Sequence, residues 1–192
     1  MKEFAIKAFD DSAEIKRRFA RDHADRIVQV AQLIGGAFQA GHKVLLFGNG
    51  GSSTDAAHIA AEFVGRYKRE RAPLPAIALA TDIAAITCIA NDYGFEELFA
   101  RQVQAHGQRG DVAIAISTSG NSLNVLKGVE AAKALGLTTI AWTGGTGGKL
   151  AGMVDYAFVV PSTLTARIQE SHITLGHVLC ELIEDHVLAN PA

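Results

Sequence analysis

The sequence predicts an α/β protein built on a five-stranded parallel sheet. Two observations lead to this prediction. Five short segments are apolar along almost their whole length, which is typical of strands that are buried on both faces. Segments with apolar residues at helical spacing lie between them, and strands that alternate with helices form parallel sheets with right-handed crossovers. The length of 192 residues favours one domain.

The chain opens on a region, 1–40, in which apolar residues such as Ile27, Val30 and Ile34 recur at helical spacing. Gly41 is expected to end this region. We therefore describe the chain as a single domain, 1–192, with residues 1–40 as an N-terminal helical extension. Strands are predicted at 43–48, 75–80, 111–117, 138–144 and 156–161, and helices at 53–67, 82–90, 96–106, 122–135 and 165–188.

The composition argues against a disordered chain and against a nucleic-acid-binding protein. Apolar residues make up 48% of the chain, which is enough for a full core, and the formal net charge is −2. No long basic block is present, which argues against a nucleic-acid partner. The short basic cluster Arg66–Arg71 is expected to be a solvated helix end and loop.

The sequence contains no recognisable signal peptide, membrane span or disulfide pattern. The N-terminal segment lacks the apolar core of a signal peptide, and no run of 18 apolar residues occurs, so we expect a cytoplasmic protein with no membrane partner. Cys88 and Cys180 lie in apolar runs and are expected to be small buried side chains rather than a disulfide.

Two loops rich in glycine and hydroxyl groups follow the first and third predicted strands. One is Asn49-Gly50-Gly51-Ser52-Ser53, and the other runs from Ser117 through Thr118 and Ser119 to Ser122. Each leads into a helix, whose unpaired N–H groups and positive potential suit an anion. The serines are also common helix caps. Because ligands of parallel sheets bind at the carboxyl ends of the strands, two such loops at one edge favour a phosphate site.

His58 and Glu62 lie four residues apart on the helix that follows the first loop, so their side chains share a face. An imidazole and a carboxylate can form half of a zinc site. Alternatively, the pair is a buried histidine whose hydrogen bond is satisfied by the carboxylate. Gln169 and His177 are about 12 Å apart along a predicted helix. Their spacing alone does not pair them with His58 and Glu62. His172 and Trp142 are expected to pack in the core or at an interface.

Six stretches together resemble the sugar isomerase (SIS) family over nearly the whole chain, and within it the phosphoheptose isomerases. They are GNGGS at 48–52, HIAAEFVGRY at 58–67, NDYGF at 91–95, STSGNS at 117–122, TGGTGGKLAG at 143–152 and RIQESHITLGH at 167–177. The resemblance implies a flavodoxin-like three-layer sandwich. It also implies a homotetramer with sites at subunit interfaces, which the apolar helices at both ends of the chain favour as well.

The activity implied by the resemblance is conversion of D-sedoheptulose 7-phosphate to D-glycero-D-manno-heptose 7-phosphate through an enediol, the first step of bacterial nucleotide-heptose synthesis. The resemblance leaves open the anomer formed and whether the heptose enters lipopolysaccharide, capsule or a surface-layer glycan. It implies one zinc ion per subunit, held by residues matching His58, Glu62, Gln169 and His177. Substrate contacts are expected from both loops and beyond them: Asn49, Gly50, Gly51, Ser52, Glu62, Arg66, Asn91, Asp92, Ser117, Thr118, Ser119, Ser122 and Gln169.

The chemistry needs a base and an acid, for which Glu62 and His177 are the candidates. The roles of Glu62 as base and as metal ligand compete, and Asp92, expected on a loop, is the next candidate for the base. Arg66 is expected to steer the substrate or to pair with a neighbouring chain. The alternative function is that of a non-catalytic phosphosugar-binding protein similar to the replication-initiator-associating protein. That protein differs at the positions of Glu62 and His177, so their presence favours the enzyme.

Overall fold

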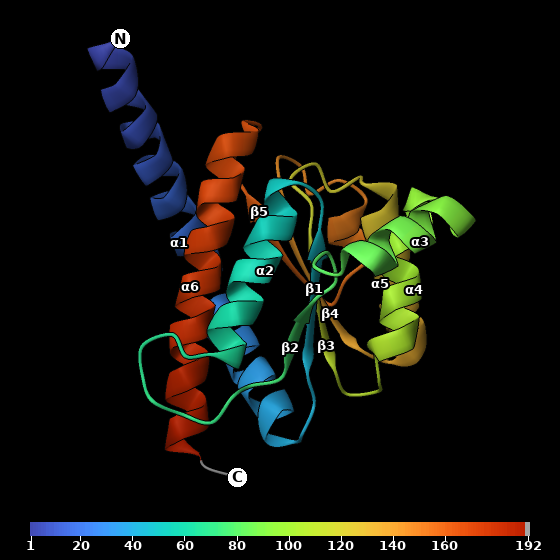
Figure 1. The fold of residues 1–192 in the computed structure, drawn as a ribbon. Helices are drawn as coiled ribbons and strands as arrows, with labels where there is room; N and C mark the ends of the chain where they lie inside the picture. Colours follow the sequence, from blue (N-terminus) through green and yellow to red (C-terminus); the bar gives the residue numbers. More distant parts are fainter. Residues whose placement is uncertain (191–192) are drawn as a thin grey trace.

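The computed structural model describes residues 1–190 and contains a five-stranded, all-parallel sheet (Figure 1), as predicted. Its strands are β1 (Val44–Gly48), β2 (Ala76–Ala78), β3 (Val112–Ile116), β4 (Thr138–Gly144) and β5 (Tyr156–Val160). Their order in the sheet is β2-β1-β3-β4-β5, so the winding reverses between β1 and β3. Loops leave such a reversal in opposite directions, and a crevice opens between them at the carboxyl ends of the strands.

Helices cover both faces of the sheet, which confirms the three-layer sandwich (Figure 1). On one face lie α1 (Lys2–Gln39), α2 (Gly51–Val64) and α6 (Thr165–Ala189). On the other lie α3 (Ile83–Tyr93), α4 (Leu98–His106) and α5 (Leu123–Leu135). Two short 3₁₀ helices, η1 (Phe95–Glu97) and η2 (Leu150–Gly152), complete the described structure. Among residues 1–190, no helix is long and apolar enough to cross a membrane.

The pleat of the strands divides the core into two clusters. In β1, Val44 and Leu46 pack toward α1, α2 and α6, whereas Leu45 and Phe47 pack toward α4 and α5. All five residues of β1 and all five of β3 are buried. Because both faces of these strands are covered, they are apolar throughout instead of alternating with polar residues.

The predicted N-terminal helices are one continuous helix, α1. Its second half belongs to the core, where Val30 and Ile34 are fully buried and Phe38 packs edge-on against Phe63 of α2. Its first turns project beyond the rest of the fold (Figure 1), and Phe4 and Phe9 are 78% and 81% exposed there. α1 packs along α6 for much of its length.

Two expectations for the region around α3 are wrong. The helix continues through Asn91 and Asp92, which therefore lie in its last turn and not in a loop. It ends at Tyr93, and the next residue, Gly94, has a φ of +94°, which suits glycine. Cys88 is exposed, because no residue of α3 is buried. Cys180 is buried, as predicted.

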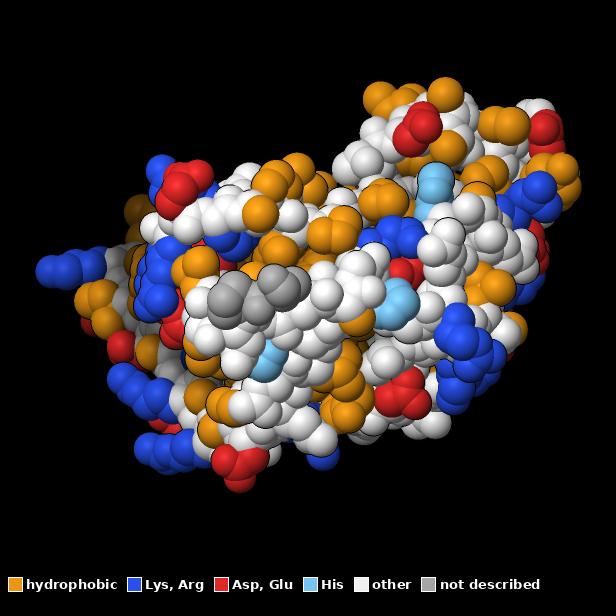
Figure 2. Space-filling view, turned by 90° about the horizontal axis from the view of Figure 1, so that it is seen from below, with side chains coloured by type: hydrophobic (Ala, Val, Ile, Leu, Met, Phe, Trp, Pro, Cys, Tyr) orange, Lys and Arg blue, Asp and Glu red, His pale blue; other side chains and the backbone are white. Residues whose placement is uncertain are grey.

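Figure 2 shows the end of the molecule at which the strands begin, opposite to their carboxyl ends. Lys and Arg side chains there are interspersed with Asp and Glu and with hydrophobic side chains, so charges of both signs are mixed on this face.

His172 and Trp142 are both fully buried, in agreement with their expected packing role. The Nε2 of His172 lies 3.1 Å from the carbonyl oxygen of Thr143 in β4. Burial lowers the pKa of His172 to about 4, although the bond to Thr143 opposes this shift. The imidazole is therefore neutral in the folded protein at neutral pH.

This pKa makes the stability depend on pH. The unfolded chain binds a proton at this residue below pH 6.5, whereas the folded chain binds it only near pH 4. Stability contributed by neutral His172 is therefore present above pH 6.5 and is lost as the pH falls toward 4. Between pH 7 and pH 5 the loss is expected to be about 2 kcal/mol. In His172→Gln, whose amide retains a donor for Thr143, this part of the pH dependence should vanish in urea unfolding. Equal pH dependence in both proteins would contradict the assignment.

Candidate active site

A hydroxyl-rich pocket of about 230 Å³ lies at the switch point between β1 and β3. This volume is below the roughly 300–1,000 Å³ typical of pockets for drug-sized ligands, so it suits a small polar group. The pocket brings together six of the predicted substrate-binding residues, Asn49, Ser52, Ser117, Thr118, Ser122 and Gln169, with Ile116 and Thr165.

The serines in the pocket are not occupied as helix caps. Ser122 is the N-cap residue of α5 but makes no side-chain capping bond, and its Oγ lies 3.2 Å from Oγ of Ser117. By contrast, Ser53 donates to the carbonyl of Gly50, and Ser119 accepts from the amide of Asn121. The pocket hydroxyls and the N-termini of α2 and α5 thus provide donors for an anion.

Asn124 is a structural residue of this pocket that sequence reasoning missed. Its side-chain amide and that of Asn49 exchange two hydrogen bonds, of 2.8 and 2.9 Å. These bonds join the loop after β1 to the first turn of α5. A lone asparagine inside a helix carries no signal for such a pairing, because it depends on contact between segments 75 residues apart.

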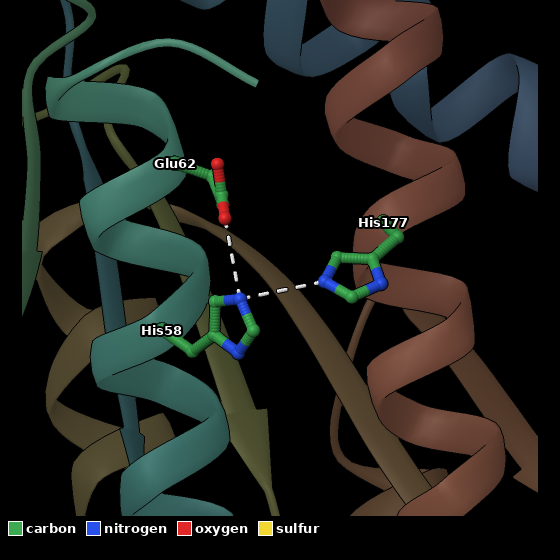
Figure 3. Close-up of side chains that lie close together, drawn as sticks. All are labelled: His58, Glu62 and His177. Atoms are coloured by element: carbon green, nitrogen blue, oxygen red, sulfur yellow. Dashed lines mark hydrogen bonds and ion pairs between the residues drawn. The ribbon is translucent and has the colours of Figure 1, made fainter. Parts of the chain in front are cut away.

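A second group of predicted residues meets between α2 and α6. His58, Glu62 and His177 point toward one another from these two helices (Figure 3), and their ligand atoms all lie within 4.8 Å of one another. Nε2 of His58 is 3.2 Å from Oε1 of Glu62 and 3.4 Å from Nε2 of His177.

These distances fit a bound divalent metal ion. Two ligands of a tetrahedral zinc ion with bonds of about 2.0–2.1 Å lie about 3.3 Å apart. Two imidazole nitrogens that face each other, beside a carboxylate, are also a donor set that zinc prefers. The thiol of Cys180 does not belong to this group of converging ligand atoms, and burial together with the Glu62 carboxylate raises its pKa to about 12.

The cluster depends on an unusually close approach of α6 to α2. Gly176 precedes His177, and a Cβ atom at this position would lie only 2.5 Å from Cδ1 of Ile59 in α2. The absence of a side chain lets the two helices approach at this level. His177 is thereby brought next to His58, although 119 residues separate them in the chain.

Gln169 of α6 contacts the start of α2, whereas the His–Glu–His cluster lies nearer the end of that helix. A Cβ atom at Gly51 would collide with the side-chain amide of Gln169, so Gln169 covers the first turn of α2 and lines the hydroxyl pocket. His58 is seven residues further along α2, about 10 Å at 1.5 Å per residue. Gln169 therefore belongs to the pocket and lies on the same helix as His177.

Besides Glu62, six predicted substrate-binding residues do not line the hydroxyl pocket. Ser119 lines an adjoining pocket together with Thr118 and Gly144 to Thr146. Arg66 is exposed and pairs with Glu70 at 3.6 Å. Asn91 and Asp92 are exposed on α3, on the other face of the sheet, where the amide of Asn91 donates to Asp92. Gly50 and Gly51 are exposed at the start of α2.

The fold and this pocket define the class of protein. The family description "SIS domain" matches residues 9–144, and the chain belongs to this family of sugar isomerase domains.

Within this family, the chain is similar to proteins named phosphoheptose isomerase. A protein named phosphoheptose isomerase from Thermodesulfovibrio yellowstonii is 57% identical over 97% of this chain and 92% of its own length. One with the same name from Aquifex aeolicus is 59% identical over 97% of this chain and 98% of its own. The solved structure of a phosphoheptose isomerase from Neisseria gonorrhoeae superposes with a TM-score of 0.91 at 43% identity, covering 96% of this chain and 98% of that one.

The close approach at Gly176 is testable. Gly176→Ala is expected to destabilise the protein by about 1–3 kcal/mol, because the added methyl group overpacks the contact with Ile59. It should also weaken zinc binding, because His177 moves away from His58. Thermal unfolding and zinc titration measure the two effects.

Gly36→Ala is the matched control. Gly36 lies in α1, and an added Cβ there would meet no atom within 4 Å. This substitution should stabilise the helix by about 0.5–1 kcal/mol and leave zinc affinity unchanged. If the two alanine variants behaved alike, the close approach at Gly176 would not be what places His177.

Proposed function

We propose that this chain is an aldose–ketose isomerase that converts D-sedoheptulose 7-phosphate to D-glycero-D-manno-heptose 7-phosphate. The observation that supports this best is the placement of a phosphate-sized hydroxyl pocket and a His–Glu–His cluster along the same helix, α2. The names of the relatives agree with it. The alternative, a phosphosugar-binding protein without catalysis, is not favoured, because Glu62 and His177 are both present and lie together.

The substrate's phosphate is held by Ser52, Ser117 and Ser122 at the starts of α2 and α5. Ser52 and Glu62 are ten residues apart, about 15 Å along a helix, and side chains shorten this span. An extended sugar phosphate anchored in the pocket therefore directs its C1–C2 end toward the cluster. Gln169, which lines the pocket from α6, is positioned to contact the sugar chain between the two.

The reaction moves one proton from C1 to C2 through a cis-enediol. Glu62 takes the proton from C1 and returns it to C2, and His177 exchanges a proton with the substrate oxygens. Oε1 of Glu62 faces His58, whereas no donor within residues 1–190 contacts Oε2, so Oε2 is the oxygen free to accept the proton. A zinc ion held by His58, Glu62 and His177 would supply Lewis-acid polarisation of the carbonyl group. Gln169, the fourth ligand that the family resemblance implies, lines the hydroxyl pocket against Gly51 instead.

We propose a homotetramer with sites at subunit interfaces, and the apolar surface that one chain leaves exposed supports association between chains. α3 is an apolar helix without a buried residue, and Ile83 is 76% exposed on it. Monomeric proteins rarely expose such a surface. Asn91, Asp92 and Arg66 lie outside the pocket of their own chain, so we infer that they reach the pocket of a neighbouring subunit. We place the enzyme in the cytoplasm, where the free thiols Cys88 and Cys180 remain reduced.

The activity is tested by incubating the purified protein with sedoheptulose 7-phosphate and following the C2 proton of the product by NMR. Glu62→Gln keeps the shape of the side chain and removes the base. It should lower turnover by about 10²- to 10⁴-fold while substrate still binds. Near-normal turnover in this variant would reassign the base, with Asp92 as the next candidate.

The phosphate assignment is tested with Ser122→Ala. Loss of one donor to a charged phosphate should raise KM about tenfold with little change in kcat, because a hydrogen bond to a charged group contributes about 1.5–3 kcal/mol. Ser53→Ala is the control, since the Ser53 hydroxyl already bonds to Gly50 outside the pocket. Equal KM values for the two variants would exclude Ser122 from phosphate binding.

The oligomeric state is tested by sedimentation. The 20.3 kDa chain should sediment at about four times this mass. Phe4→Asp combined with Phe9→Asp places charges on the exposed apolar side of α1 and should shift the population to smaller species with loss of activity. A fully active monomer would rule out sites shared between subunits.

A further inference from the structure

The segment that follows α2 is not the solvated stretch that its basic composition suggests. Residues 65–75 leave α2, pass around α6 and return to β2 (Figure 1). The side chains of Arg71 in this segment and Glu184 in α6 are each only 2% exposed, and Nε of Arg71 lies 3.1 Å from Oε1 of Glu184. The expectation of solvation is therefore wrong for Arg71. A charge is buried in this way only when partners satisfy it on all sides.

Glu184 receives those partners from the backbone of the segment. The amides of Tyr67, Lys68 and Arg69 donate to its carboxylate at 2.8, 3.0 and 3.1 Å. Burial acts to raise the pKa of Glu184, but these three donors and the Arg71 guanidinium outweigh it and hold the pKa below its ordinary value. Consecutive N–H groups around one anion fix the path of the backbone through Tyr67.

Arg71 ties the same segment to the end of α2. Its guanidinium donates to the carbonyl oxygens of Glu62 and Phe63, each at 2.8 Å. These carbonyls belong to the last turn of α2, which has no intrahelical partners for them. The buried ion pair therefore connects the backbone of Glu62 with α6, two turns beyond His177 on the same helix.

Tyr67, in the same segment as Arg71, contacts His177 of the His–Glu–His cluster. Its ring lies nearly parallel to the imidazole of His177, with ring centroids 5.5 Å apart and an interplanar angle of 21°. This is an offset-stacked arrangement. The imidazole also meets the ring of His58 in a T-shaped arrangement, with centroids 5.1 Å apart and an interplanar angle of 70°. His177 thus contacts both a tyrosine and a histidine, with its Nε2 directed at His58 (Figure 3).

We propose that Tyr67 is a positioning residue for His177, and that the buried Arg71–Glu184 pair holds Tyr67 in place. The inference rests on the proposed function, in which His177 acts in the cluster. Rotation of the imidazole about its Cβ–Cγ bond would carry Nε2 away from His58 and Glu62. The stacked tyrosine ring opposes this rotation, so the cluster keeps its geometry before any ligand binds.

The deciding experiment uses the metal-free protein with 13C-labelled histidine rings. Tyr67→Leu removes the aromatic ring, and Tyr67→Phe keeps it as the matched control. We expect the ring signals of His177 to shift and its contacts with His58 to weaken in Tyr67→Leu, with wild-type behaviour in Tyr67→Phe. The signals of His106, on the exposed end of α4, serve as the internal reference and should not move. Unchanged His177 signals in Tyr67→Leu would overturn the proposal.

A second measurement connects positioning with metal binding. Titration with Zn²⁺ should show an affinity about 10- to 100-fold lower in Tyr67→Leu than in Tyr67→Phe, the range expected when support for a metal ligand is lost. Glu184→Gln should shift the His177 signals in the same direction, since its amide has one acceptor oxygen for the four donors from Tyr67, Lys68, Arg69 and Arg71 that the carboxylate binds. Equal zinc affinity in the leucine and phenylalanine variants would also overturn the proposal.

The two measurements separate this inference from the proposed function. A wild-type protein that isomerises no sugar phosphate, or binds no zinc, contradicts the proposed function alone, because the histidine signals of the metal-free protein are measured independently of both. A normal isomerase in which Tyr67→Leu leaves His177 unmoved contradicts the positioning role alone.

Discussion

The contact between α2 and α6 is the constraint on which the candidate site depends. α2 provides His58 and Glu62, and α6 provides Gln169 and His177. Glycine at position 176 lets the helices approach near the middle of the contact, and Gln169 packs directly against Gly51 at the start of α2. The Arg71–Glu184 pair joins the same two elements at the far end of α2. The two helices are thus connected near both ends of α2, and a glycine permits their contact at the level of Ile59.

The order of the strands determines where the phosphate pocket forms. Because the winding reverses between β1 and β3, the loops that follow them leave the sheet on opposite faces and start α2 and α5. Two helix N-termini therefore flank one crevice. The reciprocal amide bonds between Asn49 and Asn124 hold the two loops together, while the hydroxyls of Ser117 and Ser122 remain in the pocket. Within these loops, the asparagines therefore stabilise the structure, and the serines are available to bind a ligand.

Two buried titratable side chains, Glu184 and His172, are accommodated in different ways. Glu184 and Arg71 are buried as an ion pair whose remaining atoms meet backbone donors and acceptors. His172 is buried without a charged partner, and burial accordingly holds it in the neutral form. Glu184 and His172 both belong to α6. Among the most exposed large apolar side chains, in contrast, Phe4 and Phe9 lie on the first turns of α1 and Ile83 lies on α3, the surfaces that we assign to contacts with other subunits.

The sequence by itself determined the parallel sheet, the layer of helices on each face and the two hydroxyl-rich loops. These follow from local signals: wholly apolar strands, helical periodicity, and glycine and serine at strand ends. It also placed His58 and Glu62 on one helical face, because a spacing of four residues is a property of the helix itself. His177 joined them only through a family resemblance, since no spacing within α6 points to α2. The tertiary structure alone decided that Arg71 is buried, that Cys88 is exposed, that Asn124 pairs with Asn49 and that Tyr67 stacks on His177. Each of these contacts joins residues far apart in the chain or depends on which helix face remains uncovered, and such information arises only when the elements pack together.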